Sequence, residues 1–391
     1  MTKLDRLLFV TPELQYSNSS AAIRNRLLVE GLSEYYAVDV LEIIRDDKKN
    51  KTTDLSQYIS TYFSIECIRT SKANDTRKSF IRKLKRFVID NVQKVIPDKV
   101  YLLRDSLPNN LNVKEYQVVF SSSDPKGIHK YVCNEIYKVT DAVKVQYWGD
   151  PWYDDLSFGS GQLVKFLENR ILSKSDIVLY NSVATLERQK KLYPLSSDKM
   201  FCLPRGVSSF SLANARAKRL AIPTGIPNNV RALYAGDYHS NIRNLQNLVK
   251  ACEDLDLPLA IYGEGCELKT SSPAVSINSR VSKSELEEIS ESYNLDVIVL
   301  NRHGGQLPGK IYDSLISDRH VLVLLDGGFS EKDIPLNDRF TFCKNDVASI
   351  KAVFSTPNNH SGELFSLDEI ESVNITSLLS PICHLINNKR V

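Results

Sequence analysis

The chain has 391 residues, of which 42% are hydrophobic and 25% charged, and its formal net charge is +3. It is too long for one ordinary core and suits two α/β domains. The near-neutral balance, without basic residues interleaved with aromatic ones, argues against a nucleic-acid-binding protein. No run of about eighteen apolar residues occurs, and residues 1–13 lead directly into a strand pattern, which argues against a membrane span or signal peptide. We therefore expect a cytoplasmic protein.

The first half alternates strand and helix patterns. Strands are predicted at 7–11, 38–44, 117–122, 143–148 and 176–182, and helices at about 21–36, 78–95, 126–138 and 161–173. This alternation favours right-handed crossovers and a mostly parallel sheet with helices on both faces. Residues 1–205 are thus predicted to form a doubly wound domain.

The second half repeats this plan after a break. Residues 206–230 contain prolines and small residues without a clear period, as a linker would. Strands then follow at 231–236, 258–263, 274–278, 296–301 and 320–328, with helices at 242–255, 283–292 and 309–317. The segment 365–387 reads as helix, and we expect about 372–391 to return to the first domain. The fold class is α/β, with two doubly wound Rossmann-like domains (1–205 and 206–371) facing across a ligand-binding cleft.

Residues 77–95 combine an apolar stripe with a basic one, which six side chains within 77–86 form at helical spacing. Such a helix could lie on an anionic membrane surface, at the inner face of the cytoplasmic membrane. It could equally be a surface helix that packs its stripe on its own domain.

Seven cysteines and six histidines occur singly, without CxxC, HExxH or HxH spacing. The pattern indicates neither a zinc site nor a secreted disulfide framework. We expect buried free thiols, no metal ion and no other cofactor.

Two polar segments follow strands of the first domain. Ser19 and Ser20 precede a helix, where they either cap it or let the chain approach a ligand closely. Asp150 lies between Gly149 and Pro151, and both tryptophans of the chain flank it. A carboxylate on a constrained loop near aromatic surfaces is typical of sugar binding or acid/base chemistry, although packing alone could explain the tryptophans.

In the second domain, residues 301–315 (NRHGGQLPGKIYDSL) place a Gly-rich turn before a helix. Backbone N–H groups at Gly309 and the charge of Lys310 would attract phosphate, and Asp313 could accept hydrogen bonds from sugar hydroxyls. Alternatively, the glycine and proline residues only mark the start of a helix and bind no ligand. Arg243 follows an earlier strand and suits a diphosphate, and Gly263 belongs to a Gly-rich turn after the next strand.

Together these segments resemble GT-B glycosyltransferases, especially the retaining family-4-type enzymes of bacterial capsule, O-antigen and exopolysaccharide assembly. In the first half the similar segments are TPELQYSNSSAAIRN (11–25), IPDKVYLLRD (96–105), VVFSSSDPKGIHKYV (118–132) and YWGDPW (147–152). In the second half they are PRGV (204–207), LYAG (233–236), IYGEG (261–265), RVSKSEL (280–286), DVIVL (296–300) and LPGKIYDSL (307–315).

The chain departs from the family pattern at five positions. Family members commonly carry two glutamates with seven residues between them, where this chain has Gly305 and Asp313. Asp237 stands where a basic residue is common, and Ser19 and Ser20 replace a glycine pair.

The resemblance implies sugar transfer, with retention and without a metal, from a nucleotide sugar such as a UDP- or GDP-sugar. The acceptor would be a hydroxyl of a bacterial surface glycan or lipid-linked oligosaccharide. Catalytic roles fall on Asp150, Arg243 and Lys310, and donor-binding roles on Ser19, Ser20, Arg205, Gly263, Gly304, Gly305, Gly309 and Asp313. Because Gly305 replaces a glutamate, a non-catalytic GT-B subunit of a polysaccharide-synthesis complex stays open, as does a nucleotide-sugar epimerase. The absence of GxGxxG after the first strand disfavours a dehydrogenase.

Overall fold

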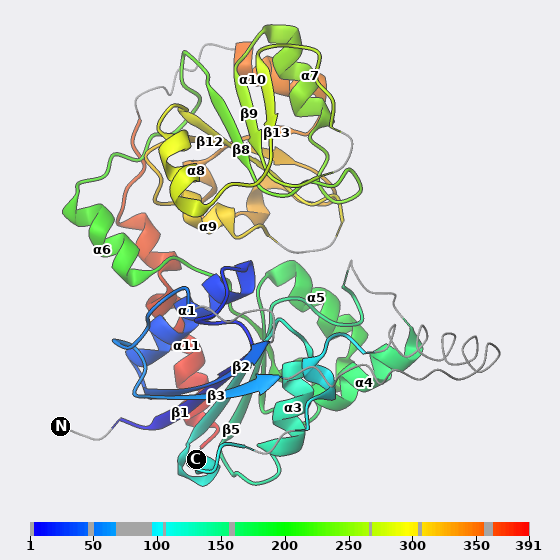
Figure 1. Ribbon diagram of the computed structural model, residues 1–391, viewed down its shortest axis with the longest axis vertical. Coiled ribbons are helices and arrows are strands. Elements are labelled where there is room, and N and C mark those ends of the chain that lie inside the picture. Colours follow the sequence, from blue (N-terminus) through cyan, green and yellow to red (C-terminus); the bar gives the residue numbers. More distant parts are fainter. Residues whose placement is uncertain are drawn as a thin grey trace, which may run out of the picture. The chain divides into compact units, whose positions relative to one another are not determined.

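The computed structural model describes residues 4–45, 51–67, 96–104, 107–155, 161–265, 268–303, 307–355 and 363–390. The chain forms two compact units, which Figure 1 draws as separate sheets with their helices. Unit 1 comprises Met1–Ser208 with Ile375–Val391, and unit 2 comprises Ser209–Asn374. The predicted basic helix at 77–95 lies outside the described residues.

Unit 1 is built on a parallel sheet with the strand order β3-β2-β1-β4-β5-β6-β7. The strands are Arg6–Thr11 (β1), Ala37–Arg45 (β2), Thr61–Cys67 (β3), Val118–Ser122 (β4), Val143–Trp148 (β5), Ile177–Tyr180 (β6) and Met200–Cys202 (β7). The inner strands are continuous buried runs, as expected of a sheet covered on both faces. The edge strands β3 and β7 were not predicted. Polar residues interrupt the apolar ones in β3, and β7 has only three residues.

Helices cover both faces of this sheet. Ser20–Ser33 (α1) and Ile375–Asn388 (α11) share one core, whereas Gly127–Glu135 (α3), Gln162–Leu172 (α4) and Val183–Leu192 (α5) share the other. Figure 1 shows α1 and α11 side by side. They approach closely at Gly31, where an added Cβ would lie 2.6 Å from Leu379 Cδ1. The end of the chain therefore belongs to unit 1.

Unit 2 has a parallel sheet with the order β10-β9-β8-β11-β12-β13. Its strands are Ala232–Ala235 (β8), Leu259–Tyr262 (β9), Val275–Asn278 (β10), Leu295–Val299 (β11), His320–Leu325 (β12) and Thr341–Lys344 (β13). Its helices are Ser209–Ala217 (α6), Gln246–Leu255 (α7), Lys283–Ser290 (α8), Lys310–Ser314 (α9) and Val347–Ser355 (α10). Apolar residues of α7 and α10 pack with the strands in one core.

Three sequence predictions need correction. The supposed linker 206–230 contains helix α6, whose small residues hid its helical period. The predicted helix 365–387 is two elements, the 3-10 helix Glu369–Val373 (η6) and α11, which are separated at Asn374. Helix α7 begins at Gln246, four residues later than predicted, because residues 237–245 form a loop after β8.

Short 3-10 helices complete the described residues: Val100–Leu102 (η1), Val113–Glu115 (η2), Pro194–Lys199 (η3), Glu331–Asp333 (η4) and Asn337–Arg339 (η5). The six cysteines in these residues are free thiols. None of the described helices has the length and apolar character needed to cross a bilayer.

Candidate functional site

In unit 2 the strand order reverses between β8 and β11. The chain after β8 continues to one side of the sheet and the chain after β11 to the other, so the two loops diverge at the carboxyl ends of these strands. Open α/β sheets bind ligands at such a point. The loop after β8 carries Arg243, and the loop after β11 leads to Lys310.

Arg243 lies in the loop before α7 and spans the gap between the two central strands. Its Nε donates a hydrogen bond to Oδ1 of Asn301 at 2.8 Å, and its Nη1 donates to the carbonyl oxygen of Asp237 at 3.4 Å. Asn301 is buried and follows β11 closely. These contacts fix the guanidinium while leaving other N–H groups for a ligand. Sequence reasoning missed Asn301, for which the only signal was a polar residue at the end of an apolar strand run.

Lys310 brings a second cation to the same loop. A Cβ added at Gly236, which has φ +151°, would lie 3.2 Å from Lys310 Nζ, and the ring centroid of Tyr234 is 5.8 Å from this ammonium. The Lys310 side chain is exposed to solvent. Desolvation by surrounding protein atoms, followed by repulsion from Arg243, lowers the pKa of Lys310 to about 8. Lys310 is thus a cation at neutral pH that gains from an anionic partner.

The helix after Gly309 is shorter than predicted. Helix α9 runs over Lys310–Ser314 instead of 309–317, and the Asp313 N–H donates to the Gly309 carbonyl at 3.3 Å. Five residues build little helix dipole, so the positive charge here comes from the lysine side chain. Asp313 is exposed. Gly304 and Gly305 lie outside the described residues.

Gly263 brings the loops after β8 and β9 together. A Cβ at this position would lie 2.0 Å from the carbonyl oxygen of Gly236, so the backbone contact leaves no room for a side chain. The Gly236 N–H donates to the Tyr262 carbonyl at 2.8 Å, which continues the pairing of the two strands. In the structure, Gly263 therefore shapes the loop that holds Gly236 and Asp237.

Asp237 and Arg280 form an ion pair that sequence reasoning did not find. The other carboxylate oxygen of Asp237 accepts a hydrogen bond from the Glu264 N–H at 3.1 Å. Partial burial opposes ionisation of Asp237, but Arg280 and this N–H outweigh it and lower the pKa of the carboxyl group. The departure from the family pattern at Asp237 is thus matched by a nearby arginine.

In unit 1 the order reverses between β1 and β4. After β1, the Ser19 hydroxyl accepts the Ala22 N–H at 3.1 Å and donates to Glu13 Oε2 at 2.9 Å. It therefore caps α1, as the simpler interpretation expected. Ser20 is the first residue of the helix and is exposed.

Asp150 belongs to a charged cluster beyond β4 and β5. The buried ammonium of Lys126 lies 2.5 Å from Asp155 Oδ2 and 3.2 Å from Asp124 Oδ1. Burial and the neighbouring Asp124 raise the pKa of Asp150 to about 7, against the opposing effect of Lys126 and Arg24. A carboxyl group of this kind can accept or release a proton near neutral pH.

Neither tryptophan beside Asp150 offers a binding surface. Trp148 and Trp152 are 0% and 1% exposed, and the Trp148 ring centroid lies 4.2 Å from that of His129 in the core. The two tryptophans lie near Asp150 because they pack in the core. The interpretation that they form an aromatic surface for a sugar is therefore wrong. Arg205 follows β7 and is buried in unit 1.

No protein-family model matches the sequence, and no curated protein matches it either. Many solved structures are similar to this chain, among them three that cover almost all of it. An α,α-trehalose 6-phosphate synthase from Burkholderia multivorans has a TM-score of 0.58 at 10% identity, covering 99% of this chain and 99% of its own. The lipopolysaccharide outer core galactosyltransferase WaaB, in its apo form, has 0.55 at 12%, covering 98% and 99%. HepE from Anabaena, in complex with UDP and glucose, has 0.51 at 9%, covering 98% of each chain.

The chain has the GT-B fold. Two parallel sheets with interspersed helices follow each other along the sequence, as in these glycosyltransferases. The predicted α/β fold class, with two parallel-sheet units in series, is confirmed. Assignment to the retaining family-4 type stays a prediction.

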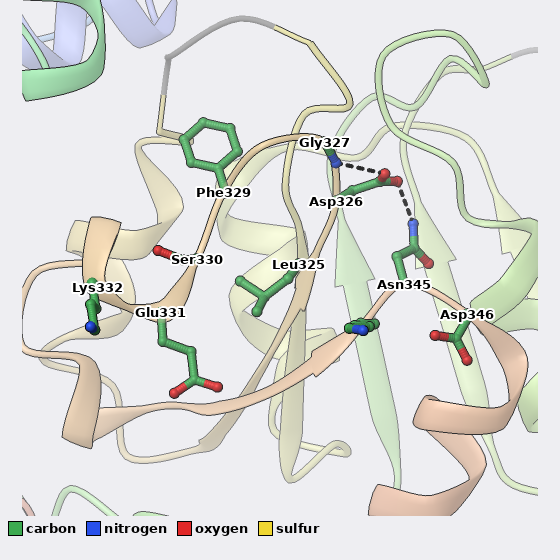
Figure 2. Close-up of a pocket in the computed structure, with 10 residues that line it drawn as sticks. Leu325, Asp326, Gly327, Phe329, Ser330, Glu331, Lys332, Asn345 and Asp346 are labelled. Carbon is green, nitrogen blue, oxygen red and sulfur yellow. Dashed lines mark hydrogen bonds between the residues drawn. The ribbon is translucent and has the colours of Figure 1, made fainter. Parts of the chain in front are cut away.

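The GT-B chain also has a pocket of about 740 Å³ beyond β12 and β13, which holds none of the predicted site residues. Figure 2 shows Asp326 in its wall, accepting hydrogen bonds from the Gly327 N–H and the Asn345 side chain, each at 2.8 Å. Ser330 is likewise tied to Asp333. We place the candidate site at Arg243 and Lys310 instead, because two cations meet there at the reversal of strand order.

Within the described residues, no group of three His, Cys, Asp or Glu side chains is arranged to hold a metal ion.

Proposed function

We propose that this protein is a glycosyltransferase that uses a nucleoside diphosphate sugar, such as a UDP- or GDP-sugar, as donor. The observation that carries the proposal is the meeting of Arg243 and Lys310 at residues 236–237, from loops on both sides of the strand-order reversal. Two cations at one loop match the charge of a diphosphate. HepE, which is similar in fold, binds UDP and glucose, and this supports a nucleotide-sugar ligand.

The chemistry needs stabilisation of a leaving group. The bond from the anomeric carbon to the diphosphate oxygen breaks, and the acceptor oxygen forms the new bond to that carbon. Negative charge develops on the diphosphate, where Arg243 and Lys310 stabilise it without a metal. Asp313 would accept hydrogen bonds from the ribose, and backbone groups at Gly304 and Gly305 would lie near the hexose. We propose retention at the anomeric carbon, as the family resemblance implies.

The acceptor is proposed to bind unit 1 through Asp150. A carboxyl group with a pKa of about 7 can take the proton that the acceptor hydroxyl loses. The acceptor would be a bacterial surface glycan or a lipid-linked oligosaccharide, and residues 77–95 would bring the protein to an anionic membrane. The proposed acceptor class and the membrane contact rest on the sequence.

The test is transfer and hydrolysis by the full-length protein across a panel of nucleotide sugars, followed by mass spectrometry. Lys310→Ala and Arg243→Ala should each reduce turnover about 100-fold or more, since removal of one charge-stabilising group commonly costs this much. Lys351→Ala is the matched control, because Lys351 pairs with Asp254 on an exposed surface of unit 2. Wild-type turnover in Lys310→Ala would refute the role assigned to Lys310, and absence of transfer or hydrolysis with every donor would refute the proposed activity.

A non-catalytic subunit is the second candidate, because Gly305 stands where a glutamate is common. A protein that has lost its donor site would show no thermal stabilisation by any nucleotide sugar. Stabilisation without product formation would instead indicate a binding subunit. Conversion of the donor sugar without an acceptor would indicate an epimerase.

A further inference from the structure

Three cations converge on two consecutive residues of unit 2. Lys310 lies against Gly236, and Arg243 donates to the carbonyl oxygen of Asp237 at 3.4 Å. On its other side, the Asp237 carboxylate pairs with Arg280. Arg280 follows β10, so the three side chains come from loops after three different strands. Asp237 therefore contacts two of these cations, Arg280 through its carboxylate and Arg243 through its carbonyl oxygen.

The contact between Asp237 and Arg280 is easily exchanged. Its side chains are 63% exposed at Arg280 and 40% exposed at Asp237. Exposed ion pairs contribute only about 0–1 kcal/mol. A phosphate offers the guanidinium two parallel hydrogen bonds and more charge than a carboxylate. A nucleotide can thus replace Asp237 as the partner of Arg280 at small cost.

Asp237 itself is held by other contacts. Its Oδ1 accepts the Glu264 N–H at 3.1 Å, and its carbonyl oxygen accepts from Tyr234 Oη at 3.2 Å as well as from Arg243. These bonds do not need Arg280. The loop that supports Arg243 can therefore stay in place while the Arg280 side chain turns away.

The arrangement fits the direction of the expected ligand. Arg243 and Lys310 lie at the reversal between β8 and β11, whereas Arg280 lies beyond β9, after β10. A nucleoside diphosphate carries two phosphates, so the distal one can bind Arg243 and Lys310 while the nucleoside-proximal one faces the neighbouring strand ends. Arg280, after β10, is the cation on that side of the site.

We propose that Arg280 is a third nucleotide-binding cation, which Asp237 holds in the empty protein and releases to the nucleoside-proximal phosphate on binding. Asp237 then acts as a positioning residue that competes with the ligand. The inference rests on the proposed function, because it concerns the same diphosphate site. It predicts that removing one member of a salt bridge improves binding.

Titration calorimetry of the full-length protein with UDP and with GDP tests the proposal. Asp237→Asn keeps the acceptor for the Glu264 N–H but loses the charge, and it should tighten nucleotide binding about three- to tenfold. Arg280→Gln should weaken binding about tenfold, and Arg280→Lys should recover part of the loss. Thermal unfolding checks that each variant is folded. Asp154→Asn and Arg188→Gln, which break an ion pair of unit 1, are controls that should leave binding unchanged.

The outcomes separate this inference from the proposed function. Weaker or unchanged binding in Asp237→Asn, or unchanged binding in Arg280→Gln, overturns the inference. If Arg243→Ala and Lys310→Ala nevertheless lose binding, the proposed donor site stands. If the wild-type protein binds neither nucleotide, both ideas fail.

Discussion

Asn301 accepts a hydrogen bond from Arg243 at 2.8 Å, and this contact joins the loops that follow the two central strands of unit 2. The residues are 58 positions apart in the sequence. Because Asn301 is buried at the end of β11, its side chain has a fixed orientation. The guanidinium of Arg243 is therefore oriented before any ligand arrives, which lowers the entropic cost of binding.

Asn301→Ala should weaken UDP binding about ten- to a hundredfold. The substitution removes the acceptor that orients Arg243, and a hydrogen bond to a charged group contributes about 1.5–3 kcal/mol. Calorimetry measures the change. Asn294→Ala is a suitable control, because Asn294 accepts from the Arg231 N–H at 2.9 Å and donates to the Asn229 carbonyl at 2.6 Å, at the amino ends of β8 and β11. Equal effects of the two variants would show that Asn301 only stabilises the fold.

Nucleotide binding should depend on the protonation of Lys310. With a pKa of about 8 in the free protein, the lysine is charged below this pH and loses its charge above it. UDP affinity should therefore be constant from pH 7 to about 8 and then fall, by up to about tenfold per pH unit. Lys310→Arg should bind with a flat profile over the same range, because arginine stays charged. A fall of equal steepness in that variant would assign the pH dependence to another group.

The sequence could predict what local patterns encode. Continuous apolar runs located the inner strands, and their alternation with helices gave the fold class. The edge strand β3 escaped because its polar residues mimic a loop. Arg243 and Lys310 were chosen for their charge after a strand, but their partners Asn301 and Gly236 depend on contacts between distant loops. The two tryptophans are close to Asp150 in the sequence, and this suggested an aromatic binding surface. Their side chains are buried, which the sequence did not indicate.

Asp150 should make the stability of the protein depend on pH. Its pKa in the folded state, about 7, lies above the ordinary value of 3.8, so the folded state binds the proton more tightly than the unfolded chain. This contribution favours folding at acidic pH and is lost as pH rises through about 7. Asp150→Asn should therefore unfold at a higher temperature than wild type at pH 8, with a smaller difference at pH 5. A difference that is the same at both pH values would contradict the raised pKa.

Gly263→Ala should disturb both the stability of unit 2 and its nucleotide site. The new Cβ would lie 2.0 Å from the carbonyl oxygen of Gly236. This neighbour is backbone and cannot rotate away, so the loops after β8 and β9 must separate, at a cost of about 1–3 kcal/mol. The separation moves Gly236 and Asp237 away from Lys310 and Arg243. We expect a lower midpoint of thermal unfolding together with weaker UDP binding.

Gly328→Ala provides the matched control for this substitution. A Cβ at Gly328 would meet nothing within 4 Å, so the free energy of unfolding should change by no more than about 0.5 kcal/mol. Nucleotide affinity should be unchanged, because Gly328 lies beyond β12 and outside the contacts of Arg243. If Gly263→Ala were as stable as Gly328→Ala and bound UDP equally well, the loops after β8 and β9 would not need their close approach. The support assigned to Gly263 would then be wrong, because the cations keep their positions without it.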